Sequence, residues 1–162
     1  MAEMFLYLDN IPGESLDLTH HDKIEIKNWQ WTTENFVRWD VNQGGQSTRV
    51  KIDHIELNKI CDKASVTLYQ NCVTGKHIKN GKIICRKNDG DQKVEYLIVT
   101  LTDIMVTKVN WTGDGDSPSL NETIGLAFAE FRLDYKVQDD SGSPGGGKMF
   151  AFNVQKQHGE HS

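Results

Sequence analysis

The residues best suited to metal or acid–base chemistry are six histidines and 23 acidic side chains. His20 and His21 follow Asp17, but adjacent residues of an extended segment point to opposite sides. We therefore interpret both as solvated or structural histidines. His158 and His161 lie in a Gly-containing C-terminal segment. They indicate adventitious metal binding there and not a built metal site. The sequence predicts no metal site and no cofactor.

The acidic residues match no known catalytic or calcium-binding pattern. Asp114 and Asp116 resemble the start of a calcium loop, yet positions six and twelve are Ser119 and Gly125 instead of Gly and Glu, so we interpret the segment as a turn. No GxSxG elbow, HExxH pair or P-loop is present. A glycosidase needs two carboxylates that face a cleft, and the sequence alone neither excludes nor supports such a pair. We predict that the chain is not an enzyme.

Charge and cysteine content narrow the class further. The net charge of −5, from 23 acidic and 18 basic residues, argues against nucleic acid as a partner, because phosphate binding needs a clustered basic face. Cys61, Cys72 and Cys85 form no CxxC pair, which favours buried or semi-buried free thiols in a reducing compartment.

The N-terminus gives no sign of a cleaved signal. The segment from Met1 to Asp9 has no basic region, and its apolar run is too short for a signal peptide. No stretch approaches the ~20 apolar residues of a membrane span, so we expect no membrane insertion. We expect synthesis in the cytosol and, where export occurs, a route that reads no cleavable signal.

The elements that position these residues are mostly strands, in what we expect to be one domain over 1–162. Apolar and polar residues alternate along most of the chain, which indicates β structure. The expected strands cover about 4–9, 23–33, 48–60, 78–88, 92–109, 122–137 and 148–156. A helix is expected over about 62–74, with Asp62 as its N-cap and Gly75 after its end. The last residues, about 157–162, are expected to form a mobile tail.

Three of the expected strands change the parity of their apolar residues midway. Ile124, Leu126 and Phe128 are followed by Phe131 and Leu133 on the opposite parity. Because side chains alternate strictly along a strand, such a change requires a bulge or burial on the other face. Long strands of this kind are typical of a small β-barrel made of two curved antiparallel sheets, with the helix flanking it.

A long polar loop over about 33–48 carries exposed-type apolar residues, namely Phe36, Val37, Trp39 and Val41. A loop of this length inside a compact domain is usually functional. We interpret the four residues as anchors for another protein surface, with folding back on the barrel and disorder as the alternatives; the aromatic content argues against disorder.

A series of short motifs follows in order along the chain: Gly13-Glu14-Ser15-Leu16-Asp17, His20, Ile24-Glu25-Ile26, Trp29-Gln30-Trp31, Asp62-Lys63-Ala64-Ser65, Glu95-Tyr96-Leu97, Phe128-Ala129 and Tyr135-Lys136-Val137. In their order and spacing these motifs resemble the haemolysin-coregulated protein (Hcp) family. The resemblance covers essentially the whole chain. The departures are Gln30, where relatives often carry a smaller polar residue, and Val66, where proline is common.

The resemblance implies a function. Relatives form six-membered rings that stack into the tube of the bacterial type VI secretion system, driven outward by a contractile sheath. The family's extended loop reaches a neighbouring subunit, which assigns that role to the loop over 33–48. Relatives bind small effectors in the ring lumen, where the residue between the paired aromatics lies, and that residue is Gln30 here. The implied partners are a second copy of the chain, spike and sheath components, and secreted effectors.

Two other classes stay open from the residues alone. A monomeric β-barrel module for a small ligand or carbohydrate predicts a pocket containing Phe36 and Trp39. A hydrolase with an unrecognised carboxylate pair predicts turnover that one Asp or Glu substitution abolishes. The sequence stops soon after the last expected strand, so we expect no fused toxin domain.

Overall fold

The computed structural model describes residues 3–40, 42, 44–138, 144–156 and 158–161. The elements are β1 (Glu3–Leu8), β2 (Ile24–Ile26), β3 (Asn28–Gln30), β4 (Thr33–Asp40), β5 (Gly44–Ile52), β6 (Ile55–Ile60), α1 (Ala64–Thr74), β7 (Ile78–Asp89), β8 (Gln92–Thr112), β9 (Asn121–Gln138), β10 (Pro144–Asn153) and β11 (His158–His161). The mainly β class with one helix is therefore confirmed.

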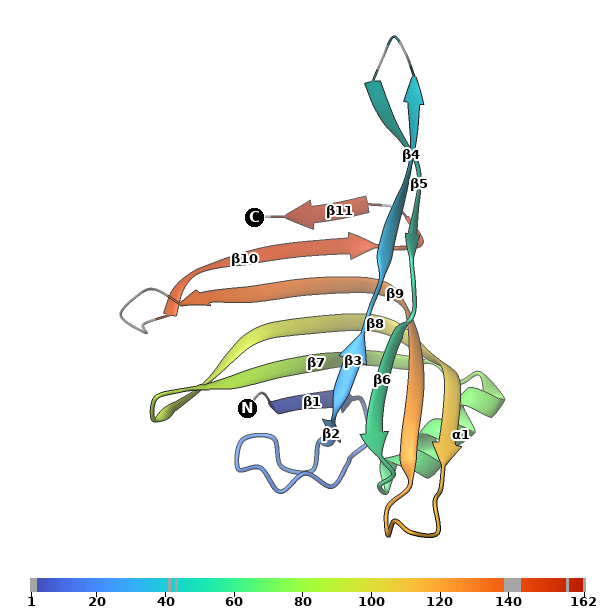
Figure 1. Cartoon of the computed structure of the whole chain (residues 1–162), viewed down its shortest axis with the longest axis vertical. Helices are drawn as coiled ribbons and strands as arrows, with labels where there is room; N and C mark the ends of the chain where they lie inside the picture. Colours follow the sequence, from blue (N-terminus) through green and yellow to red (C-terminus); the bar gives the residue numbers. More distant parts are fainter. Residues whose placement is uncertain (1–2, 41, 43, 139–143, 157, 162) are drawn as a thin grey trace.

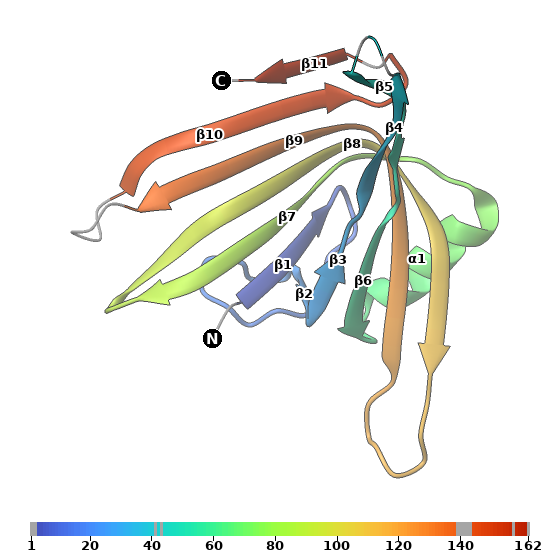
Figure 2. The same cartoon turned by 45° about the horizontal axis from the view of Figure 1, so that its top comes forward.

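Nine of the strands form one antiparallel sheet that curls into a nearly closed barrel (Figures 1 and 2). The strand order is β11-β10-β9-β8-β7-β1-β2, while β6 pairs with β9 on one side and β3 on the other. The curl nearly closes where β2 passes into β3, because Lys27 N–H there donates to the Asn58 carbonyl of β6 at 2.8 Å. We expected two curved sheets; instead one sheet builds the whole barrel, and the second sheet is the separate pair β4–β5.

A crease across β7, β8 and β9 makes this curvature possible. On β8, Leu101 and Ile104 are both buried, although residues three apart on a regular strand point to opposite faces. Asp103 between them has a positive φ of 54°. On β9, Phe131 and Leu126 are likewise both buried on opposite parities. The left-handed residue turns the strand so that the same barrel interior is covered before and after it. The parity change predicted for residues 124–133 is confirmed.

The barrel interior is a continuous aliphatic core. Its fully buried members come from β1, β2, β6, β7, β8, β9 and α1: Leu6, Ile24, Ile55, Leu57, Leu68, Ile83, Val99, Leu101, Ile104, Ile124 and Leu126. Trp31 packs over one end, with its ring centroid 4.9 Å from Phe131 and 5.5 Å from Phe128 in edge-on geometry. Burial of this kind stabilises by about 25 cal/mol per Å² of apolar surface.

Helix α1 lies against the lower end of the barrel (Figure 1). Asp62 precedes it, and its carboxylate accepts the Ala64 N–H at 3.0 Å, which satisfies one free donor of the first turn. Gly75 ends it in the left-handed conformation, with a φ of 70°. Only one face is buried, through Ala64, Leu68 and their neighbours. Among the described residues no helix has the length and apolarity needed to cross a membrane.

The C-terminal segment differs from the mobile tail that we expected over 157–162. Residues His158–His161 form β11, which pairs with Phe150–Asn153 of β10 in antiparallel register. A polar segment becomes a strand here because the edge of β10 offers unpaired backbone groups. Residues 157 and 162 lie outside the described part of the chain.

Candidate functional site

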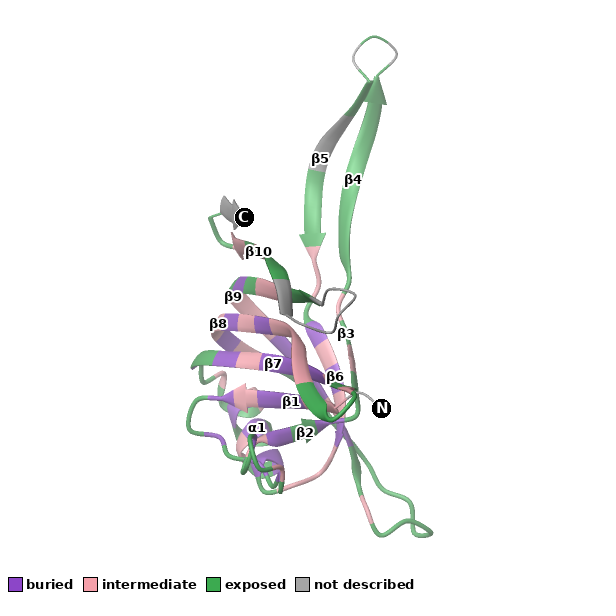
Figure 3. Ribbon diagram, turned by 90° about the vertical axis from the view of Figure 1, so that its left-hand side faces the viewer, coloured by how far each residue is buried: buried purple, intermediate pink, exposed green. Residues whose placement is uncertain are grey.

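The strands β4 and β5 form a hairpin, which we call the arm, that projects beyond the barrel along the long axis of the molecule (Figures 1 and 3). It replaces the irregular loop expected over 33–48, because the two strands pair from Thr33↔Ile52 to Asp40↔Gly44 and so satisfy each other's backbone groups. Every residue of β4 is exposed. The arm does not fold back on its own barrel.

The predicted anchors lie on this arm. Phe36 and Val37 are exposed, and Trp39 is the most open of the three at 77%. Val41 lies outside the described residues. The pocket that a monomeric ligand-binding module predicted around Phe36 and Trp39 is therefore contradicted by their exposure.

Contacts between its own two strands fix the shape of the arm. Trp39 lies across Gly45, where an added Cβ would meet its ring at 2.8 Å. The guanidinium carbon of Arg49 lies 4.9 Å from the centre of the Phe36 ring, which is cation–π distance. A bulge between Phe36 and Val37 adds local twist. The apolar groups are thus presented on a preorganised element, which lowers the entropy lost when a partner binds.

Gln30 lies at the end of β3 and pairs with Glu56 of β6. It is exposed, whereas Trp29 and Trp31 on either side are packed against the core. The predicted alternation of the paired aromatics and Gln30 is therefore confirmed. A hollow of about 470 Å³ lies at this position, at the base of the arm, and Lys51 and His54 are among the residues that line it.

The segment between β1 and β2 contains the Gly-Glu-Ser motif, and the structure gives each residue a physical reason. A Cβ at Gly13 would lie 2.5 Å from the Lys23 carbonyl oxygen, so only glycine fits. The Glu14 carboxylate accepts the Lys63 N–H at 2.9 Å, just before α1. Ser15 is buried, and its hydroxyl accepts the Asp17 N–H at 3.1 Å. The motif folds the segment onto the outer face of β1.

A buried arginine holds the same segment down. Arg86 of β7 is 3% exposed; its Nη1 donates to Asp17 Oδ1 at 3.1 Å and its Nε to Glu3 Oε2 at 2.8 Å. These charge-assisted bonds hold the pKa values of the Asp17 and Glu3 carboxyls below their ordinary range and raise the pKa of the Arg86 guanidinium. Sequence reasoning missed this cluster, since the partners are far apart in the chain.

His20 completes the packing of this segment as a structural residue. It is buried, its ring lies 4.6 Å from the Phe5 ring, and its Nε2 is 2.8 Å from Glu95 Oε1. The Tyr7 hydroxyl contacts the other ring nitrogen. His21, by contrast, is largely exposed. Both positions agree with our interpretation of the pair.

A second buried charge, also missed by sequence reasoning, ties α1 to the barrel. Lys59 of β6 is fully buried, and its ammonium group lies 3.0 Å from Asp62 Oδ1 and 3.1 Å from Glu122 Oε1. It also donates to the Ser65 hydroxyl of α1 at 3.0 Å. The other oxygen of Glu122 accepts from the Trp111 indole N–H. Alternation places Lys59 on the buried parity of β6, which is the one signal that could have revealed it.

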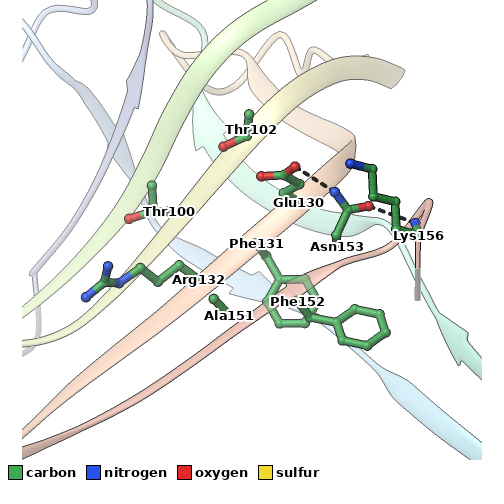
Figure 4. A pocket seen from close by; sticks show the side chains of 9 residues that line it. All are labelled: Thr100, Thr102, Glu130, Phe131, Arg132, Ala151, Phe152, Asn153 and Lys156. Carbon is green, nitrogen blue, oxygen red and sulfur yellow. Dashed lines mark hydrogen bonds between the residues drawn. The ribbon is translucent and has the colours of Figure 1, made fainter. Parts of the chain in front are cut away.

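A groove on the outer face of β8, β9 and β10 has a volume of about 410 Å³ (Figure 4). Glu130 and Arg132 have protein partners: Asn153 Nδ2 donates to Glu130 Oε1 at 2.6 Å, and Arg132 Nε donates to Asp134 Oδ2 at 2.9 Å. With Glu130, Arg132 and Lys156 in its lining, the groove carries charges of both signs and builds no single-sign field for one class of ligand.

The three cysteines are free thiols, and the part of the chain that the structure describes holds no cluster of metal ligands. Cys61, Cys72 and Cys85 are all free, as predicted, and burial raises the pKa of the Cys61 and Cys85 thiols, which keeps them protonated. Across residues 3–40, 42, 44–138, 144–156 and 158–161, no three His, Cys, Asp or Glu side chains gather as a metal site.

The features with the clearest capacity for function are therefore contact surfaces on a creased β-barrel with a projecting arm. Residues 5–135 match the family model described as "Type VI secretion system effector, Hcp". The chain therefore belongs to the Hcp family of type VI secretion system tube proteins, as the resemblance predicted. These are secreted structural proteins and not enzymes.

Individual relatives agree along the whole length. The chain is 32% identical to Protein hcp1 of Pseudomonas aeruginosa over 156 residues, which is 96% of both chains. The structure is similar to that of a type six secretion system protein, with a TM-score of 0.91, 25% identity and coverage of 99% of this chain and 100% of the other. It is also similar to Hcp1 of Salmonella typhimurium, with a TM-score of 0.79, 29% identity and coverage of 98% and 99%.

Proposed function

We propose that the chain assembles into closed six-membered rings that stack into the secretion tube, and that the arm makes a contact between subunits. The observation that carries this proposal is the arm itself. Phe36, Val37 and Trp39 are exposed on a preorganised hairpin that projects from the barrel. Large apolar groups exposed together on a rigid element are typical of protein–protein interfaces.

The remaining parts of the proposal concern the lumen, the partners and the export route. Gln30 faces the ring lumen, where small secreted effectors bind by enclosure and modest polar contacts. Its exposure and the hollow beside Lys51 and Glu56 support this assignment. Spike and sheath components are the other partners. The chain is made in the bacterial cytoplasm and leaves it without a cleaved signal peptide.

Native mass spectrometry with negative-stain imaging tests the assembly. We expect a ring of six times the 18.4 kDa chain mass. A stable monomer at all concentrations would contradict the proposed rings.

The variant Trp39→Ala tests the arm. Because the Trp39 side chain is largely exposed and its ring lies across Gly45 of the same hairpin, the circular dichroism spectrum is expected to stay unchanged. Assembly, as rings or as stacks, is expected to weaken by about tenfold or more, which is typical of an interfacial tryptophan. Glu34→Ala, on the same exposed strand, is the matched control and is expected to assemble normally. Unchanged assembly of Trp39→Ala would remove the anchor role, and loss of folding would place Trp39 in the core.

A further inference from the structure

A row of polar side chains crosses the outer face of the barrel, over strands that lie side by side in the order β2, β1, β7 and β8 (Figure 1). Tyr7 of β1 pairs with Lys82 of β7, and Lys82 pairs with Thr100 of β8. Lys23 lies on the other side of Tyr7, directly before β2. Because side chains alternate along a strand and Leu6 is fully buried, this row points away from the core.

The two lysines of the row both contact the ring of Tyr7. The Lys23 Nζ lies 4.6 Å from the ring centre and the Lys82 Nζ lies 4.8 Å from it, which is cation–π distance. The Tyr7 hydroxyl contacts the buried His20, which holds the ring in place. Two ammonium groups from different strands are therefore gathered around one fixed ring.

Neither of these ammonium groups has a carboxylate partner in the part of the chain that the structure describes. Asp22, next to Lys23 in the sequence, contacts His21 at 3.3 Å instead, and the Asp9 carboxylate accepts the Asn80 side-chain N–H at 3.1 Å. Both lysines are half-buried, although lysine side chains usually lie in open solvent. Two partly desolvated like charges disfavour each other, and an anion bound to both relieves that cost.

A hollow of about 280 Å³ lies at this row, and Tyr7, Lys23, Lys82 and Thr100 are among the residues that line it. Its volume is many times the ~30 Å³ of one water molecule, so a small oxyanion fits. The Thr100 hydroxyl has no hydrogen-bond partner among the residues that the structure describes. The hollow thus offers three donors, namely two ammonium groups and one hydroxyl, to a single ligand.

We propose that this hollow binds a phosphate group, either free or carried by a small molecule, and we call it the anion site: Tyr7, Lys23, Lys82 and Thr100. A phosphate group carries a charge of about −1.5 to −2 at neutral pH and three strong acceptor oxygens. A carboxylate carries a single charge and two oxygens. The charge and the donors of the anion site therefore match phosphate better. This site goes beyond the proposed tube and does not depend on it.

Equilibrium dialysis with radiolabelled inorganic phosphate tests the anion site on the purified full chain. The ionic strength is held constant, because salt screens exposed charges. We expect saturable binding of one phosphate per chain. Absence of saturable binding in a sample whose rings are intact by native mass overturns the anion site and leaves the proposed rings standing. Saturable binding to a stable monomer supports the anion site and contradicts the rings.

Single substitutions locate the bound phosphate. Lys23→Gln and Lys82→Gln are each expected to weaken phosphate binding by at least about tenfold, because each removes one charge-assisted hydrogen bond. Lys79→Gln is the matched control: it changes the net charge equally, and Lys79 is exposed on the same strand as Lys82 but does not line the hollow. The control is expected to bind phosphate normally, and circular dichroism checks that all three variants fold. Equal weakening by Lys79→Gln overturns the site, because net charge alone then explains the binding.

Competition identifies the class of ligand. Unlabelled phosphate is expected to displace the labelled phosphate, whereas acetate at the same concentration is expected to displace at least about tenfold less, because it carries one charge and fewer acceptor oxygens. Equal displacement by acetate overturns the assignment to phosphate.

Discussion

The buried ion cluster at Arg86 leads to a prediction about stability. Asp17→Asn preserves the shape of the side chain and its ability to accept the Thr19 and His20 N–H bonds, which are both 3.0 Å long. What it removes is the negative charge that faces Arg86. Because the Arg86 side chain is only 3% exposed, water cannot solvate its guanidinium group in place of the lost carboxylate.

The expected loss follows from the surroundings of Arg86. Removing one partner of a buried ion pair costs about 3–5 kcal/mol in free energy of unfolding. Glu3 still accepts from the Arg86 Nε at 2.8 Å, so the loss is expected at the lower end, about 3 kcal/mol. For a chain of this length, that corresponds to a fall in Tm of about 6–12 °C.

The difference between Asp17→Asn and the unsubstituted chain also depends on pH. The pKa of Asp17 is lowered in the folded state, mainly by its hydrogen bonds to Arg86. A carboxyl with a depressed folded pKa stabilises the fold above its unfolded pKa of about 4, and this contribution is lost as the pH falls below that value. The difference in stability is therefore largest at neutral pH and narrows as the solution is acidified below about pH 4.

Denaturant unfolding, followed by circular dichroism at several pH values, measures the loss of stability and its pH dependence. All samples have the same protein concentration, because assembly makes stability concentration-dependent. Asp22→Asn in the same segment is the control: Asp22 is exposed, has a positive φ of 59° that asparagine tolerates, and is expected to change stability by less than about 0.5 kcal/mol. If Asp17→Asn were as stable as this control at pH 7, the argument from the buried arginine would be refuted.

Two further substitutions test the packing of the barrel. Lys59→Met removes the cation that faces the buried Glu122 carboxylate and is expected to lower the free energy of unfolding by about 3 kcal/mol in a urea titration. Adding Glu122→Gln is expected to recover part of this loss, and no recovery would mean that charge is not the cause. Gly13→Ala forces a Cβ into the Lys23 and Ile24 backbone and is expected to lower Tm by several degrees, whereas Gly115→Ala, where the space is open, is expected to leave Tm unchanged.

Local patterns in the sequence determined much of the barrel and its contact surfaces. Strict alternation placed Trp29 and Trp31 inward and Gln30 outward, because side chains of a strand can only take one face or the other. The parity change over residues 124–133 indicated a strongly bent strand. Apolar side chains in a polar segment indicated the exposed aromatic residues of the arm. Each of these inferences depends on neighbours in sequence.

The tertiary structure alone decided the features that join distant residues. Arg86 meets Asp17 only because β7 pairs with β1 and the motif segment folds over it, and nothing local marks that arginine as buried. The crease depends on Asp103 adopting a left-handed φ within β8, and the contact between the Tyr69 and Trp111 rings depends on α1 meeting the end of β8. The arm and the pairing of His158–His161 onto β10 join residues that are close in the sequence, but both segments are polar, so the sequence pattern predicted a loop and a tail there. The contact of Arg86 with Asp17, in contrast, follows from the curling of the sheet, which brings together residues that sequence spacing leaves unrelated.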